Sequence, residues 1–375
     1  MKEAQKVTEG KKNGRRLVSL DILRGFDMLF VVGGEELVVA VAALFGFSRF
    51  GVQFGHAEWH GLHFMDLVFP LFLFLAGVSF PFSLAASQAR GRTKGAVALK
   101  AVRRGLILFA LGLAYNGFLK HLDWAHFRVW SVLGRIGLAW MAAALVQLFL
   151  GLRARIALAV AILAGVTVFT QLVPAPGAAP GADPFSAEGN FFCWLDRTLT
   201  AGHTYQPLFD PEGFAGLLPA VVTAMFGMFV GELLKSRCDR SESAVRPILL
   251  IALGLGAAGG AASFVCPVNK ALWSPSFSLL AGSLSCLALA FVHWAADVRG
   301  WTRWGFFFKV VGMNSIAAYL LQTVVDMKGA SAFFFGGLAR LLPSAVGAVV
   351  TELGFIATCW AVLYYLYRKG TFLKV

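Results

Sequence analysis

Apolar runs of about 20 residues recur along the whole chain, and this is the length that a helix needs to cross a bilayer. Of the 375 residues, 58% are hydrophobic and only 14% are charged, whereas soluble domains carry about 25% charged residues. The sequence therefore predicts an all-α, polytopic membrane helix bundle with about ten (10–11) transmembrane helices. The predicted spans are 17–33, 65–87, 98–118, 130–150, 155–174, 214–234, 246–266, 276–296, 304–325 and 345–367. Short additional helices are expected at 34–47 and 331–342.

Lysine and arginine are unevenly distributed over the predicted loops. Under a ten-span count, the cation-rich loops all fall on the side of both termini, which the positive-inside rule makes the cytosolic side. These loops account for the net charge of +13, so nucleic acid is not an expected partner. We expect a basic cytosolic tail over 1–16, a single transmembrane domain over 17–368 and a cytosolic C-terminal tail over 369–375. The long loops 34–64 and 175–213 then lie on the other side.

The first predicted span holds three charged residues in the stretch SLDILRGFD. Asp21, Arg24 and Asp27 are spaced at i, i+3 and i+6, so they share one face of a helix. Charges inside a span usually face a partner or a wet cavity. The residues leave two interpretations open: an Asp21–Arg24 ion pair that fixes helix packing, or an entrance where Arg24 binds an anionic ligand such as a phosphate. Further polar groups in apolar surroundings are Arg103, Arg104, Arg135, Asn116, Asn314 and Gln322.

Three histidines precede the second predicted span in the stretch HAEWHGLHFMDLVFP. The spacing of His56, His60 and His63 suits a metal on a helix, but a glycine between them weakens a helix and no further ligand set follows. No metal is predicted. A single histidine acting as general base is the simpler function, because the ordinary pKa of histidine is about 6.5. Asp66 or Glu58 would orient its ring. The alternative is an interfacial histidine that only forms hydrogen bonds.

The long loop before the sixth predicted span is rich in polar and aromatic residues. Carboxylates bind sugar hydroxyls and indole rings stack on apolar sugar faces, so a sugar ligand is one interpretation; a solvated loop with interfacial aromatics is the other. The residues concerned are Asp196, Arg197, His203, Tyr205, Asp210 and Glu212, with Trp124, Trp194 and Trp273 nearby. Cys193 and Cys266 fall on the same side, where either a disulfide or two free thiols are expected.

Several motifs resemble, in sequence and in order, those of the heparan-α-glucosaminide N-acetyltransferase family of transmembrane acyltransferases. They are RLVSLDILRGFDM, HAEWHG followed by DLVFP, GRIGLAW, DPEGFAGLLPA and GMNSIAAYLL. The resemblance implies a bacterial member in the inner (plasma) membrane that takes an acetyl group from cytosolic acetyl-CoA and passes it to an amino sugar on the periplasmic side. It places the active histidine at His56. This chain has VVGGEEL where a lysosomal relative has an Asn-rich stretch, and His60 where that relative has Asn, so the acceptor sugar stays open.

The resemblance and the residues together define an expected site within one acyltransferase domain over 17–368. We expect His56 and Asp66 to be catalytic, with His56 either deprotonating the acceptor amine, which is the favoured route, or carrying the acetyl group itself. The expected acetyl-CoA site comprises Arg24, Arg103, Arg104, Arg135 and Asn314. The expected acceptor site comprises Trp59, Glu58, Asn116, Asp196, Arg197, Asp210 and Glu212.

Two other classes of function remain as alternatives. A sugar transporter or permease is disfavoured because the sequence shows no inverted repeat and no pair of Gly- or Pro-broken spans in matching positions. A scaffolding protein of the membrane would make substitutions at the site residues silent. The expected partners are the lipid bilayer, acetyl-CoA and an amino sugar or glycan, and a homodimer is left open.

Overall fold

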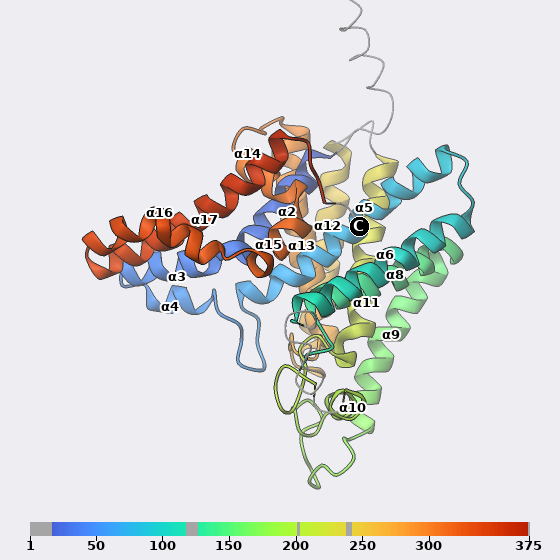
Figure 1. The fold of residues 1–375 in the computed structure, drawn as a ribbon. Helices are drawn as coiled ribbons and strands as arrows, with labels where there is room; N and C mark the ends of the chain where they lie inside the picture. The colour runs from blue at the N-terminus through green and yellow to red at the C-terminus, as the bar shows by residue number, and fades with distance from the viewer. Residues whose placement is uncertain (1–16, 118–126, 201–202, 238–241, 374–375) are drawn as a thin grey trace, which may run out of the picture.

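The computed structural model describes residues 17–117, 127–200, 203–237 and 242–373, and within them it consists of helices and loops without a β-strand. The predicted all-α fold is therefore confirmed, whereas the predicted tail over 1–16 lies outside the described residues (Figure 1). The helices are α2 (Val18–Leu29), α3 (Glu35–Leu44), α4 (Ser48–Val52), α5 (Val68–Ala89), α6 (Lys94–Tyr115), α8 (Val132–Phe149), α9 (Leu152–Leu172), α10 (Phe191–Leu199), α11 (Leu217–Ser236), α12 (Glu242–Ala262), α13 (Pro275–His293), α14 (Phe306–Met313), α15 (Ser315–Val324), α16 (Met327–Leu341) and α17 (Ser344–Arg368). The short helices expected at 34–47 and 331–342 are present as α3 and α16.

Helix α11 is the centre of the bundle and packs on α5, α8, α9 and α13. The α5–α11 contact is close because glycines face the partner backbone. A Cβ at Gly227 would lie 2.0 Å from the carbonyl oxygen of Phe74, and one at Gly77 would lie 2.2 Å from that of Ala224. Small residues at such crossings allow helices to pack tightly in lipid, where the hydrophobic effect does not drive helices together.

Helices α9 and α12 form the outside of the bundle, and both are mostly exposed in the structure. Their exposed side chains are large and aliphatic, with Val160 62%, Leu250 68% and Leu253 66% exposed. A soluble protein rarely presents such a contiguous apolar surface. The surface instead suits contact with lipid tails, so the helices are those of a multi-pass membrane protein.

The expected number of about ten spans is not confirmed. By length and composition, seven helices in the described part can cross a membrane, or eight if the bent pair α14–α15 counts as one span. Two of the ten predicted spans are not among these helices, each for a physical reason. In the predicted span 17–33, the regular α-helix stops after the 12 residues of α2. The one at 98–118 corresponds to the 22-residue α6, whose first half carries Lys100, Arg103 and Arg104.

Two helices are broken inside the bundle. Helix α2 runs into a π-helical segment, Phe30–Gly34, where Gly33 has a φ of 102° before α3 begins. A Cβ at Gly33 would also lie 2.8 Å from the ring of Phe355, so glycine suits both the backbone and the packing there. Helices α14 and α15 meet at a 72° bend at Asn314. Because α15 contacts both α2 and the π-helical segment, the two breaks are neighbours.

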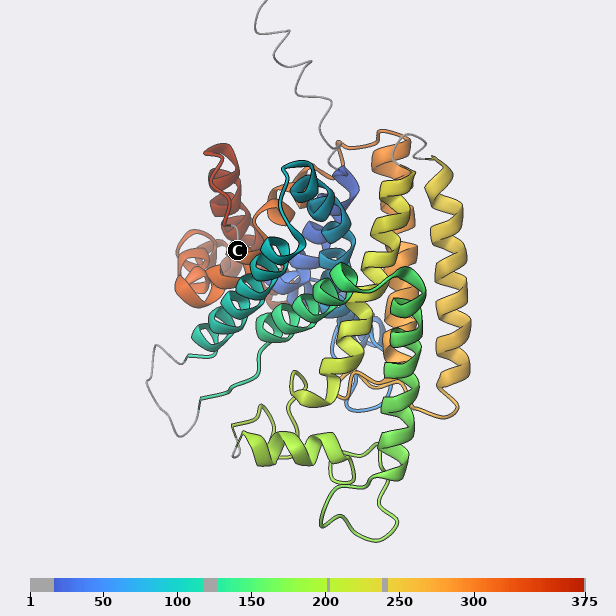
Figure 2. The same ribbon diagram turned by 90° about the vertical axis from the view of Figure 1, so that its right-hand side faces the viewer.

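The bundle has two distinct ends and a lateral arm. Helix α10 lies at one end, beside the lower end of α9, and the loops next to it reach beyond that end (Figure 2). The turn from α5 to α6 lies towards the opposite end (Figure 1). Helices α3, α16 and α17 pack together and extend away from the bundle as an arm (Figure 1).

Replacing Gly227 by alanine is expected to destabilise the bundle, because the new methyl group would force α5 and α11 apart. Overpacking of this kind costs about 1–3 kcal/mol. The measurement is the thermal unfolding midpoint of the purified protein in detergent. Gly165→Ala in α9 is the matched control, since nothing lies within 4 Å of a Cβ there. Equal midpoints for Gly227→Ala and the control would contradict the packing described.

Candidate active site

Asp66 joins the start of α5 to the loop that carries His56. One oxygen, Oδ2, accepts hydrogen bonds from the backbone N–H groups of His63 (2.9 Å) and Ala57 (3.3 Å). The other, Oδ1, lies 2.8 Å from Nδ1 of His56. A carboxylate only accepts, so Nδ1 carries the proton of the neutral ring and Nε2 keeps its lone pair. Asp66 is fully buried, whereas 53% of the His56 side chain is exposed. A ligand can therefore reach the ring that carries the unprotonated Nε2.

Lys270 lies against the same histidine, on the loop between α12 and α13. Its Nζ is 3.1 Å from Nδ1 and 3.3 Å from Nε2 of His56, and 3.7 Å from Oδ1 of Asp66. Burial lowers the pKa of the Lys270 ammonium, and the charges of Asp66 and Glu212 oppose that shift. From the sequence, Lys270 was only one of the scattered cations of the outer loops. The available signal was a lysine inside the mostly apolar stretch PVNKALW.

The loop of Lys270 is held rigidly against the loop of His56. The backbone N–H of Gly61 donates to the carbonyl of Val268 at 2.8 Å. Asn269 is fully buried and caps its own loop, since its Oδ1 accepts from the N–H of Leu272. The buried Trp273 has a φ of 50°, which is rare for a bulky residue, and its Nε1 donates to Thr223. Such backbone strain persists where the surroundings fix it, often at functional sites.

Two cavities meet beside these residues. The inner cavity, of about 200 Å³, is lined by His56, Lys270, Glu212 and Asp27 among mostly apolar side chains. The outer cavity, of about 1160 Å³, extends towards the end of the bundle where α5 turns into α6. Both cavities share a ring of lining residues, namely Phe72, Leu133, Ile136, Ser315 and Ile316. Since the same side chains line both, the two cavities adjoin within the bundle.

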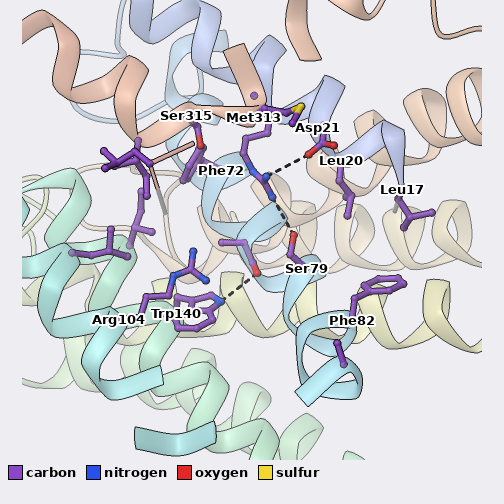
Figure 3. A pocket seen from close by; sticks show the side chains of 18 of the residues that line it. Leu17, Leu20, Asp21, Phe72, Ser79, Phe82, Arg104, Trp140, Met313 and Ser315 are labelled. Atoms are coloured by element: carbon purple, nitrogen blue, oxygen red, sulfur yellow. Dashed lines mark hydrogen bonds and ion pairs between the residues drawn. The ribbon is translucent and has the colours of Figure 1, made fainter. Parts of the chain in front are cut away.

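Cations line the outer cavity. Arg24 donates to the hydroxyl of Ser79 at 3.1 Å and lies 3.8 Å from Asp21, and the guanidinium of Arg104 lies 4.4 Å from the ring centre of Trp140 (Figure 3). Trp140 is fixed in turn by its Nε1, which donates to the carbonyl of Ala76 (Figure 3). The other lining cations are Arg90, Lys100 and Lys235. This wall suits a polyanionic ligand.

A family model described as heparan-alpha-glucosaminide N-acetyltransferase, catalytic, matches residues 16–259. The chain belongs to this family. It is similar to the heparan-alpha-glucosaminide N-acetyltransferase of Homo sapiens, with 28% identity over 416 residues that cover 96% of this chain and 60% of the relative. Its counterpart from Mus musculus is 26% identical, over 97% of this chain and 61% of the relative. The chain thus spans about three fifths of the length of these relatives.

In this member of the N-acetyltransferase family, three residues expected at the acetyl-CoA site lie outside the outer cavity. Arg103 is exposed on α6 and does not line the wall. Arg135 is fully buried; its Nη2 donates to the carbonyl of Gly213 at 2.6 Å, and its guanidinium lies over Trp273. Asn314 bonds the backbone of Thr371 and of Leu373, so it holds the C-terminal segment at the bend. Arg24 and Arg104 are the expected cations that do line the wall.

Most residues expected at the acceptor site of this family member form hydrogen bonds that fix the loops. Asp196 accepts from the N–H of Phe214 at 2.6 Å, and Asn116 donates to two carbonyl groups, of Arg128 and Trp130. Arg197 donates to the carbonyls of Ala187 and Leu208, Trp59 donates to that of Phe185, and Glu58 is exposed. Only Glu212 lines the inner cavity.

Arg128, which the sequence reading passed over, holds Glu212 in place. Its guanidinium pairs with both oxygens of Asp210 and with Glu212. Burial disfavours its charge, but these two acids raise the pKa of Arg128 well above its ordinary value. Asp210 therefore acts as a structural counter-ion, and Glu212 is the acid that remains at the cavity wall.

The other two histidines are directed to separate partners. His60 pairs with Asn269 and His63 with the carbonyl of Gly55. Among the described residues no group of three or more His, Cys, Asp or Glu side chains could hold a metal ion. Cys193 and Cys266 are free thiols, and both are buried members of one apolar cluster.

Proposed function

We propose that the protein transfers an acetyl group from acetyl-CoA, across the membrane, to the amine of a glucosamine-type sugar. The observation that carries this proposal is the pair of adjoining cavities, one lined by cations and the other by the His56–Asp66 pair. The names of the two mammalian relatives support the reaction type and the acceptor class. Residues 17–368 would form a single acyltransferase domain.

The outer cavity suits coenzyme A. Ordinary small-molecule pockets measure about 300–1,000 Å³, and this one, at about 1160 Å³, is larger. Arg24 and Arg104 would bind phosphates with Arg90, Lys100 and Lys235, and guanidinium groups are well shaped for such bidentate contacts. An extended pantetheine arm would pass the shared apolar ring and present its thioester in the inner cavity. The thioester carbon would then lie beside His56.

The chemistry at His56 is general base catalysis. An amino sugar is mostly protonated at neutral pH, so it reacts as the fraction present as free amine, whose ammonium proton has passed to the solvent. Nε2 of His56 takes the amine proton while the nitrogen attacks the thioester carbon; the C–S bond breaks and the thiolate of coenzyme A receives the proton. Asp66 holds the ring and stabilises the imidazolium that forms. Direct transfer needs no acetyl-histidine, and Glu212 provides an acceptor for the sugar hydroxyls or its ammonium.

The charge distribution supports the direction of transfer. The cation-lined cavity lies towards the turn between α5 and α6, in the part of the chain where lysine and arginine concentrate. The positive-inside rule assigns that end to the cytosol, together with both termini, in the inner membrane of a bacterium. His56 would be reached from the periplasmic end.

One observation favours a transporter as a second candidate. Helix α2 and the α14–α15 pair are both interrupted, although the sequence showed no pair of Gly- or Pro-broken spans in matching positions, and the interrupted helices contact each other. Broken helices at mid-membrane are typical of secondary transporters. A transporter would move unmodified sugar without acetyl-CoA, whereas the acyltransferase would release only acetylated sugar.

Replacing His56 by glutamine is expected to lower acetyl transfer by about 10²–10⁴-fold, the usual contribution of a positioned general base. The measurement is acetyl-CoA-dependent transfer to a panel of amino sugars by purified protein. His60→Gln, in the same loop, should keep transfer within a few-fold of wild type. Unchanged transfer by His56→Gln in folded protein would refute the proposed mechanism.

Replacing Arg104 by glutamine is expected to weaken coenzyme A binding about tenfold or more, because a hydrogen bond to a charged group contributes about 1.5–3 kcal/mol. Arg103→Gln is the matched control: it removes the same charge one residue away, but outside the cavity wall. Isothermal titration calorimetry in detergent gives both dissociation constants. Equal weakening by the two variants would mean that the cavity is not the coenzyme A site.

A further inference from the structure

We propose that Lys270 is a positioning residue whose ammonium opposes protonation of His56 next to the Asp66 carboxylate, so that the lone pair of Nε2 stays available. This inference rests on the proposed function, because it explains how the base of that reaction stays available. It concerns a residue beyond the part of the chain that the family model matches. The geometry that supports it is the contact of Lys270 Nζ with both ring nitrogens of His56, at 3.1 and 3.3 Å.

Asp66 alone would leave less of His56 in the unprotonated form that the reaction needs. A carboxylate beside an imidazole favours the charged ring, and a ring that is already protonated cannot accept a proton from the acceptor amine. The buried Asp66 holds its position by two backbone hydrogen bonds, so it cannot turn away. A second charge of opposite sign is therefore needed to offset it.

The Lys270 ammonium provides that charge. With His56 neutral, the carboxylate and the ammonium balance each other; with His56 protonated, two positive charges lie about 3 Å apart. The protonated ring is thus disfavoured before the reaction. Once formed, it also gives up its proton readily to the leaving thiolate of coenzyme A.

The other ionisable groups around His56 do not replace this arrangement. Glu35 on α3 interacts electrostatically with both His56 and Lys270. Asp27 and Tyr319 line the same inner cavity, and so does Glu212, whose charge is shared with Arg128. Asp66 and Glu35 both favour a protonated ring, and Lys270 is the cation that opposes them among the described residues that line this cavity.

The loop of Lys270 is constructed to keep the ammonium in place. Asn269 and Trp273 on either side are both fully buried and hydrogen-bonded, and the Trp273 backbone is held in a left-handed conformation. This rigid support of the loop keeps the Lys270 ammonium close to His56.

The test compares Lys270→Met and Lys270→Arg with wild type, and uses Lys328→Met, an exposed lysine on α16, as the matched control. Acetyl transfer is measured from pH 5 to 9. In Lys270→Met the acid limb of the profile should move up by about 1–2 pH units, the size of a neighbouring charge effect. Activity on the acid side of the wild-type limb then falls by up to about 10–100-fold and recovers at high pH. Lys270→Arg and Lys328→Met should keep the wild-type limb.

A second readout does not depend on acetyl transfer. Diethyl pyrocarbonate modifies a histidine ring only when the ring is unprotonated. Mass spectrometry of the peptide that contains both His56 and His60 reports the modification of each ring separately. In Lys270→Met the half-modification pH of His56 should rise, while that of His60 stays fixed. If modification of His56 has the same pH profile in wild type and Lys270→Met, the inference is overturned. If that profile shifts but wild type transfers no acetyl group, the proposed function fails and the role of Lys270 stands.

Discussion

The buried carboxylate of Asp66 is the interaction on which the reactive end of the bundle depends. A carboxylate without exposure to water must be fully hydrogen-bonded, and Asp66 meets that demand with two backbone N–H groups and the Nδ1–H of His56. These bonds fold the preceding loop back onto the start of α5. The same contacts that stabilise the charge therefore fix the position, tautomer and orientation of the candidate base.

The second constraint is close helix packing around an interior that is not filled. Glycines on α5 and α11 bring two helices together at one crossing, as at Gly77 and Gly227. The breaks at Gly33 and at the α14–α15 bend leave neighbouring helix segments out of line. The outer and inner cavities occupy the space between these parts, and the shared ring of Phe72, Leu133 and Ile136 separates a charged chamber from a mostly apolar one. An acyl donor with a charged head and a long thin arm would suit the outer cavity, and a compact acceptor would suit the inner one.

The sequence alone predicted the all-α membrane fold, because a 20-residue apolar run permits few other structures. It also indicated His56 and Asp66 as a pair: they lie ten residues apart, so one loop brings them together, although their catalytic role remains a prediction. The span count is not confirmed where charges enter a helix, as in α6, and where α2 breaks. The roles of Arg135, Asp196 and Asp210 could not be read from the sequence, since burial decides whether a charge binds ligand or protein. Lys270 was missed because 214 residues separate it from His56.

The central claim is that donor and acceptor reach one site from opposite faces of the membrane. The most direct measurement uses proteoliposomes with labelled acetyl-CoA outside and glucosamine trapped inside, with His56→Gln vesicles as the blank. The account predicts that labelled N-acetylglucosamine accumulates inside the vesicles containing wild-type protein. Label that appears only on glucosamine supplied on the same side as acetyl-CoA, and never on the trapped sugar, would contradict it.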